Sequence, residues 1–87
     1  MSGAASLRVV TLAAQAEMAL VRRDAVAGPL LAQAARAADG TAAGPLLGQS
    51  AAMVRAEPDR EAIRQAALSL CRMALHEAQA QALGSAP

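Results

Sequence analysis

Hydrophobic and polar positions along the chain follow the α-helical period, and Gly, Pro and Asp interrupt this pattern at short intervals. Apolar residues recur three and four positions apart over about 5–23, and again over a long segment of about 58–83. This spacing gathers apolar side chains on one side of a helix. The pattern predicts an all-α fold, a small bundle of three to four helices in a single domain spanning 1–87, with flexible ends at 1–4 and 84–87.

Two short helices are predicted in the middle of the chain, each initiated by a Gly-Pro pair. In each pair, Gly28-Pro29 and Gly44-Pro45, the Gly is expected to be the N-cap and the Pro the first helical residue. The amide at this position makes no intrahelical hydrogen bond, so the missing N–H of Pro costs nothing there. Asp39-Gly40 then offers a left-handed stop for the first of the two. The fourth helix is expected to start at Pro58, and at 1.5 Å per residue it would span roughly 39 Å.

The segments around the two Gly-Pro pairs also repeat each other. Residues 26–35 (VAGPLLAQAA) recur as residues 42–51 (AAGPLLGQSA), with seven identical positions in ten. A spacing of sixteen residues is short for a helix-hairpin repeat. Two interpretations stay open: two helices that share a starting sequence, or a duplicated docking unit.

The predicted long helix carries a polar stripe and two apolar faces. The polar stripe consists of Glu61, Gln65, Ser69, Arg72, His76 and Gln79. The face expected to pack in the core of the chain consists of Ile63, Ala66, Ala67, Leu70, Met73 and Ala74. The second apolar line has heptad-like spacing, and its residues form the predicted interface with a partner helix or a second copy: Leu68, Cys71, Leu75, Ala78 and Ala82. A central helix flanked by its own domain is the alternative explanation for two apolar faces.

The predicted first helix is apolar around more of its circumference than a surface helix needs. One stripe contains Leu7, Val10, Ala14, Met18 and Val21, and Val10 and Met18 are expected to hold the fold. The large apolar side chains are few for a private core, and each of the 26 Ala residues buries little area. A domain of 87 residues with such a core is marginal alone and would gain from a partner or from oligomerisation.

Composition and charge exclude several functions. The chain has no aromatic residue and no Lys, and its formal charge is +1. Without aromatic rings it can build neither a base-stacking platform nor an aromatic cage for a quaternary ammonium. The near-neutral charge gives no strong field for nucleic acid or acidic lipid. The absence of Lys beside abundant Ala, Gly and Arg is typical of a GC-rich, bacterial coding bias.

Candidate catalytic and metal-binding residues are few. Cys71 and His76 are five apart on one predicted helix, about 140° around it, so they cannot form a nucleophile–base pair there. One Cys and one His do not supply the four ligands of a structural zinc site. We therefore expect no enzyme activity, no catalytic residue, no cofactor and no metal. His76 is interpreted as a solvated residue and Cys71 as a small hydrophobe.

The sequence favours a non-enzymatic protein-interaction module that acts by helix-face docking, as an adaptor, a co-chaperone or an assembly subunit. Its partner would be another protein or a second copy of the chain. The alternative is a DNA-associated regulator or antitoxin-like dimer that uses Arg55, Arg60 and Arg64, although acidic residues lie between these arginines. No segment has about 20 apolar residues in regular helix, so no membrane span is predicted. A single Cys favours a reducing, cytoplasmic location.

Overall fold

The computed structural model describes residues 3–84, with side-chain positions from residue 5 onward, and this whole region is a four-helix bundle. The helices are α1 (Gly3–Val21), α2 (Ala27–Ala37), α3 (Ala43–Ala56) and α4 (Glu61–Gly84). The prediction of an all-α bundle is therefore confirmed. Of the predicted flexible ends, residues 3, 4 and 84 lie in helices, and the others lie outside the described residues.

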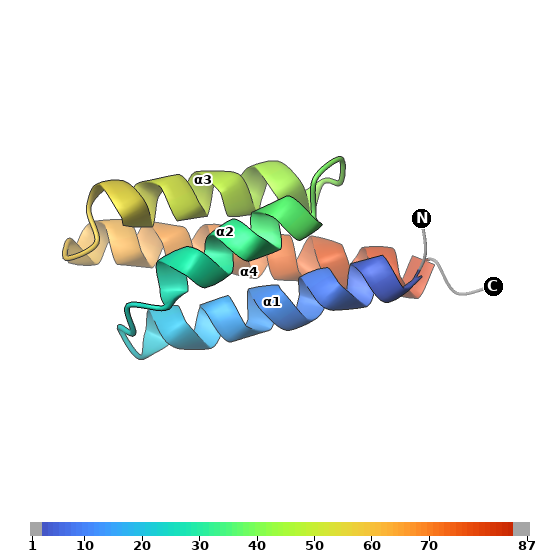
Figure 1. The fold of residues 1–87 in the computed structure, drawn as a ribbon, viewed down its shortest axis with the longest axis horizontal. Helices are drawn as coiled ribbons and strands as arrows, with labels where there is room; N and C mark the ends of the chain where they lie inside the picture. The colour runs from blue at the N-terminus through green and yellow to red at the C-terminus, as the bar shows by residue number, and fades with distance from the viewer. Residues whose placement is uncertain (1–2, 85–87) are drawn as a thin grey trace.

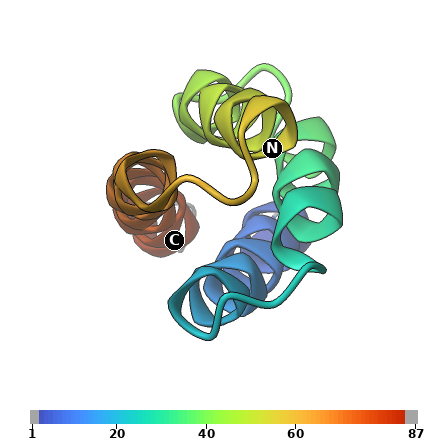
Figure 2. The same ribbon diagram turned by 90° about the vertical axis from the view of Figure 1, so that its left-hand side faces the viewer.

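The four helices lie side by side and form a ring when viewed along their length (Figures 1 and 2). Each helix packs against its two neighbours in the ring, in the order α1, α2, α3, α4 and back to α1, while the diagonal pairs barely touch. The bundle measures 43 × 21 × 17 Å, and its long dimension follows α1 and α4. One end holds the α1–α2 and α3–α4 turns, and the other holds the α2–α3 turn and the start of α1.

Ala dominates the interior and explains the tight ring. Ten of the sixteen buried apolar residues are Ala, and the largest side chains that are fully buried include Leu31 and Leu47. Small side chains let helices approach closely, but each removes little apolar area from water. The core is therefore compact and holds few large side chains.

The Gly-Pro pairs lie inside the first helical turn, so the predicted helix starts were two residues late. The N-caps are Val26 and Ala42, and neither makes a side-chain capping hydrogen bond. In α2 the first helical hydrogen bond joins the Leu30 amide to the Val26 carbonyl at 3.0 Å. Pro29 therefore still occupies a position whose missing N–H costs no helical bond.

The start of α4 also differs from the prediction. Pro58 and Asp59 form a turn, and the helix begins at Glu61, three residues after the expected start. Glu57, which precedes the proline, has φ −141° and ψ 72°. This departure from helical geometry agrees with the steric restriction that proline imposes on the residue before it. Gly40, in contrast, has the left-handed φ of 81° expected of a stop signal.

The repeated segments have the same burial pattern at all ten positions. Ala27 and Ala43 are buried, as are Leu31 and Leu47, and Ser50 is buried at the position that corresponds to Ala34. The repeat therefore encodes the register in which two neighbouring helices turn toward the same core. This register gives the repeat a structural role.

Candidate functional site

The structure buries most of the predicted interface on α4 and leaves part of the predicted core face exposed. Of the predicted interface, Leu68, Cys71 and Ala78 are at most 5% exposed and belong to the chain's own core, while Leu75 and Ala82 are half-buried. Of the face expected to hold the fold, Ala67 and Ala74 are buried, but Met73 is 54% exposed. This corrects the prediction: α1 and α3 flank α4 and cover the heptad-like line, so the line is closed to a partner in the folded chain.

Cys71 illustrates the correction. Its thiol is completely buried and donates a hydrogen bond to the Ala13 carbonyl of α1, with 3.4 Å between sulfur and oxygen. Desolvation by burial raises the pKa of the Cys71 thiol to about 11. Because the thiolate is the reactive form of cysteine, this thiol is an inert part of the α1–α4 contact.

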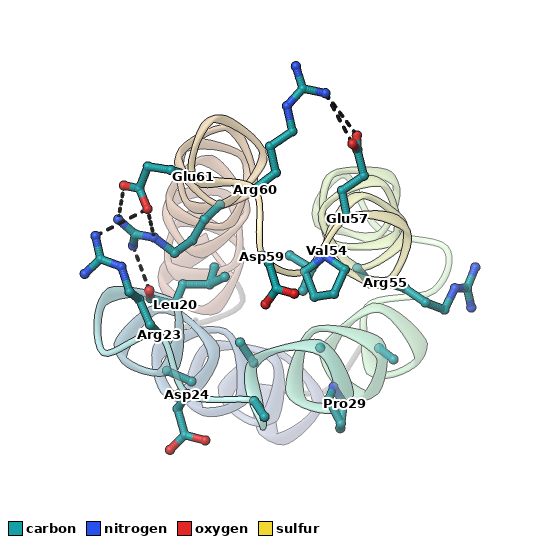
Figure 3. Close-up of a pocket in the computed structure, with 18 residues that line it drawn as sticks. Leu20, Arg23, Asp24, Pro29, Val54, Arg55, Glu57, Asp59, Arg60 and Glu61 are labelled. Atoms are coloured by element: carbon teal, nitrogen blue, oxygen red, sulfur yellow. Dashed lines mark hydrogen bonds and ion pairs between the residues drawn. The ribbon is translucent and has the colours of Figure 1, made fainter.

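The three arginines proposed for nucleic-acid contact do not form one basic surface. The Arg64 side chain is only 13% exposed, and its Nη1 donates to the Leu20 carbonyl at 2.7 Å, which ties α4 to α1. Arg60 pairs with Glu57 at 3.2 Å, and in Figure 3 Arg55 points away from both. One of the three is thus largely used in packing, and another is paired with an acid on the same turn.

His76 lies exposed on α4, and the whole predicted polar stripe of this helix is exposed as well. Within residues 3–84, no three His, Cys, Asp or Glu side chains come close enough together to hold a metal ion. In the same region, no helix combines the length and apolar character needed to cross a bilayer.

A cavity of about 710 Å³ lies at the end of the bundle where α1 and α3 finish and α2 and α4 begin (Figure 3). We call it the end cavity. Its walls include apolar side chains from three helices, most of them small: Ala19, Leu20, Ala27, Ala32, Ala51 and Val54. Its mouth carries charged residues from the turns and helix ends: Arg23, Asp24, Arg55, Glu57, Asp59, Arg60, Glu61 and Arg64. The short Ala side chains of these walls do not fill the space between the helices at this end.

A cluster around Glu61 forms one side of the mouth. Arg64 donates to both Glu61 carboxylate oxygens, at 2.6 and 2.9 Å, and Gln65 donates to the same carboxylate at 3.0 Å. Arg23, just after the end of α1, adds a fourth contact to this carboxylate, at 3.3 Å. The hydrogen bonds from Arg64 and Gln65 lower the pKa of Glu61 to about 2, with Arg23 adding electrostatic stabilisation of the carboxylate.

The end of α1 brings Arg23 into this cluster through a left-handed backbone conformation. Its φ is 56°, unlike that of any other non-glycine residue described. The Asp24 amide donates to the Ala19 carbonyl at 2.9 Å and the Arg23 amide to the Leu20 carbonyl at 3.2 Å. This is the hydrogen-bond pattern of a Schellman motif, in which Gly usually occupies the left-handed position. An Arg here accepts a backbone conformation that is unfavourable for L-residues.

Asp59 lies closest to the centre of the ring of helices in Figure 3, beside Val54, and its carboxylate is turned toward the opening. The turn of Pro58 and Asp59 places it there. No described residue forms a hydrogen bond or an ion pair with this carboxylate. The end cavity thus combines apolar walls with a carboxylate at its mouth, that of Asp59, to which no described residue bonds.

A second feature is an apolar stripe on the outer side of α1, which we call the α1 stripe. Leu7, Met18 and Val21 are 59%, 51% and 49% exposed, and Val10 and Ala14 between them are half-buried. At 100° per residue all five fall within about 80° of the helix circumference. Arg8, Gln15 and Arg22 are exposed along one edge of this stripe.

Sequence reasoning identified the residues of the α1 stripe as apolar but expected Met18 to hold the fold, whereas it is half exposed. It did not identify the end cavity, because the lining residues come from all four helices and their turns. The available signal was the crowding of charge over residues 55–61, next to a proline turn. No protein-family model, no curated protein and no solved structure matches the chain.

Proposed function

We propose that this protein is a small, non-enzymatic interaction module that docks a partner helix on the α1 stripe. The observation that carries the proposal is the exposure of three large apolar side chains, Leu7, Met18 and Val21, on one face of α1. Contiguous apolar surface on a small protein commonly marks a binding site. Residues that recur at helical spacing suit an amphipathic helix as the occupant.

The charges beside the stripe favour an acidic partner helix over a second copy. Arg8 and Arg22 border the same edge, fourteen residues apart, and neither forms an ion pair with a described residue. In an antiparallel pair of copies centred on Gln15, Arg8 of one copy would lie beside Arg22 of the other. Like charges placed opposite each other oppose association, whereas Glu or Asp on a partner helix would meet both arginines favourably.

The test is binding of a synthetic amphipathic helical peptide with a Leu face and Glu residues along its flanks, measured by fluorescence anisotropy of the labelled peptide. We expect the double variant Leu7→Gln and Met18→Gln to weaken binding at least tenfold. A matched control is Met73→Gln with Leu83→Gln, which removes exposed side chains of the same types from α4. This control should bind like the natural sequence.

Two outcomes would overturn the proposal. Equal weakening by both double variants, or no binding of the peptide, would show that the α1 stripe is not a specific docking surface. Light scattering provides the second check. If the natural sequence forms a dimer and the Leu7→Gln and Met18→Gln variant is a monomer, the occupant of the α1 stripe is a second copy and not an acidic partner helix.

A further inference from the structure

The end cavity has the dimensions and walls of a small-molecule site. Its volume of about 710 Å³ falls within the range of roughly 300–1,000 Å³ that is usual for ligand pockets. Apolar walls surround the space, and polar groups gather at the mouth (Figure 3). An apolar body could lie between the helices while a polar head remains at the opening. The α1 stripe shares no residue with the lining of this cavity, so the site does not rest on the proposed docking.

Most charged side chains at the mouth are already in ion pairs, so the charge of a suitable polar head depends on the groups that are left. Glu61 holds both Arg64 and Arg23, and Glu57 holds Arg60. Arg55 has no such partner, but it points away from the opening in Figure 3. Asp24 accepts a hydrogen bond from the Val26 amide at 3.0 Å and points away from the opening in Figure 3. Asp59 remains, with its carboxylate turned toward the opening and without a bonded partner among residues 3–84. The charge available to a ligand at the centre of the mouth is therefore negative.

We propose that the end cavity binds a small organic cation, an apolar body that ends in a primary ammonium group, with the ammonium on Asp59. A primary ammonium has three N–H donors, which match the acceptor oxygens of a carboxylate. A quaternary ammonium has no donor and is usually held by aromatic rings, which this chain lacks. The walls are apolar and consist mostly of Ala, with Leu20 and Val54, so they suit an alkyl chain or an alicyclic body.

The Glu61 cluster acts as the rigid frame of this site. Arg64 joins α4 to the end of α1 through the Leu20 carbonyl, and Arg23 returns from the end of α1 to Glu61. These contacts fix the spacing of two helices on one side of the mouth. They also occupy the cationic groups that would otherwise compete with a ligand for Asp59.

The test compares three probes with the same eight-carbon chain, n-octylammonium, n-octanol and octanoate, by backbone-amide NMR on the full chain. We expect n-octylammonium to shift the amides of the cavity walls at the lowest concentration and octanoate to bind weakest. Asp59→Asn keeps the shape of the mouth and should weaken n-octylammonium binding about tenfold, with little effect on n-octanol. Asp39→Asn, an exposed aspartate at the other end of the bundle, is the matched control and should leave binding unchanged.

A variant in the cavity wall tests whether the probes bind inside the cavity. Ala51→Leu places a larger side chain in the cavity wall and should abolish binding of all three probes while circular dichroism retains the helical signal. The Leu7→Gln and Met18→Gln variant should bind n-octylammonium normally, which separates this site from the docking surface. Octanoate binding as tightly as n-octylammonium, an unchanged affinity in Asp59→Asn, or no binding to the natural sequence would each overturn the proposal.

Discussion

The two ends of the bundle are built from helix termini of the same kinds but are packed differently. The end with the α1–α2 and α3–α4 turns contains a cavity of about 710 Å³, whereas the concave feature found at the opposite end measures about 10 Å³. At the small one, Ser6, Val9 and Ala78 lie beside the α2–α3 turn. The open end carries charge on its turns, and the closed end is filled by small side chains and backbone.

The repeated Gly-Pro segments explain part of this difference. A Cβ atom on Gly44, at the closed end, would lie 2.8 Å from the Ala38 carbonyl oxygen. A Cβ atom on Gly28, at the open end, would meet only the Val54 side chain at 3.8 Å, an ordinary contact. The same local sequence therefore permits a tight turn at one end and borders a cavity at the other.

The largest expected effects come from leucines in the two halves of the bundle. Leu47→Ala, in the well-packed half, should lower the free energy of unfolding by about 3–4 kcal/mol, since it leaves a void among buried side chains. Leu20→Ala borders the end cavity and should cost nearer to about 2 kcal/mol, because water can enter the enlarged space. Chemical denaturation followed by the helical signal measures both. Equal losses would mean that the open end is packed as tightly as the rest.

A smaller effect is expected from adding one methyl group to each Gly-Pro segment. Gly44→Ala should destabilise the protein by about 2 kcal/mol, because the new Cβ presses on backbone that cannot move freely. Gly28→Ala should be neutral or stabilising by up to about 1 kcal/mol, since Ala favours the helix and has room. Thermal unfolding of the two single variants gives the comparison. A stabilised Gly44→Ala variant would contradict the close packing of this turn.

The smallest expected effect is a loss of stability at low pH that arises from Glu61 at the open end. The pKa of Glu61 is lowered from 4.5 to about 2 by the hydrogen bonds of Arg64 and Gln65. A carboxylate with a lowered folded-state pKa stabilises the protein above its unfolded pKa, and this stabilisation is lost as the pH falls through the folded value. Stability should therefore decline from about pH 4.5 toward pH 2.

The measurement is the midpoint of unfolding as a function of pH, and its slope is compared between two variants and the natural sequence. Glu61→Gln removes the titrating carboxylate and should flatten the slope between pH 4.5 and 2. Asp39→Asn removes a carboxylate from the closed end and should leave the slope as it is in the natural sequence. If Glu61→Gln kept the full slope, the acid sensitivity would lie in other groups.

Several features could be predicted from the sequence because they depend on neighbours along the chain. The number of helices follows from apolar spacing and from the Gly and Pro punctuation, and the left-handed φ of Gly40 follows from its place after a helix. The shifted start of α4 shows the limit of this reasoning. Pro58 is compatible with a first helical turn and with a tight connection, and the geometry of the α3–α4 turn selected the connection.

The sequence by itself determined that the chain is helical and that α4 has two apolar faces. Only the tertiary structure decided which face is buried: Leu68 and Cys71 turn inward, and Met73 remains half exposed. The physical reason is that helix periodicity fixes the angles between side chains around one helix but not the direction from which other helices approach. The position of Asp59 over the end cavity has the same origin, because a cavity between four helices is a property of their packing.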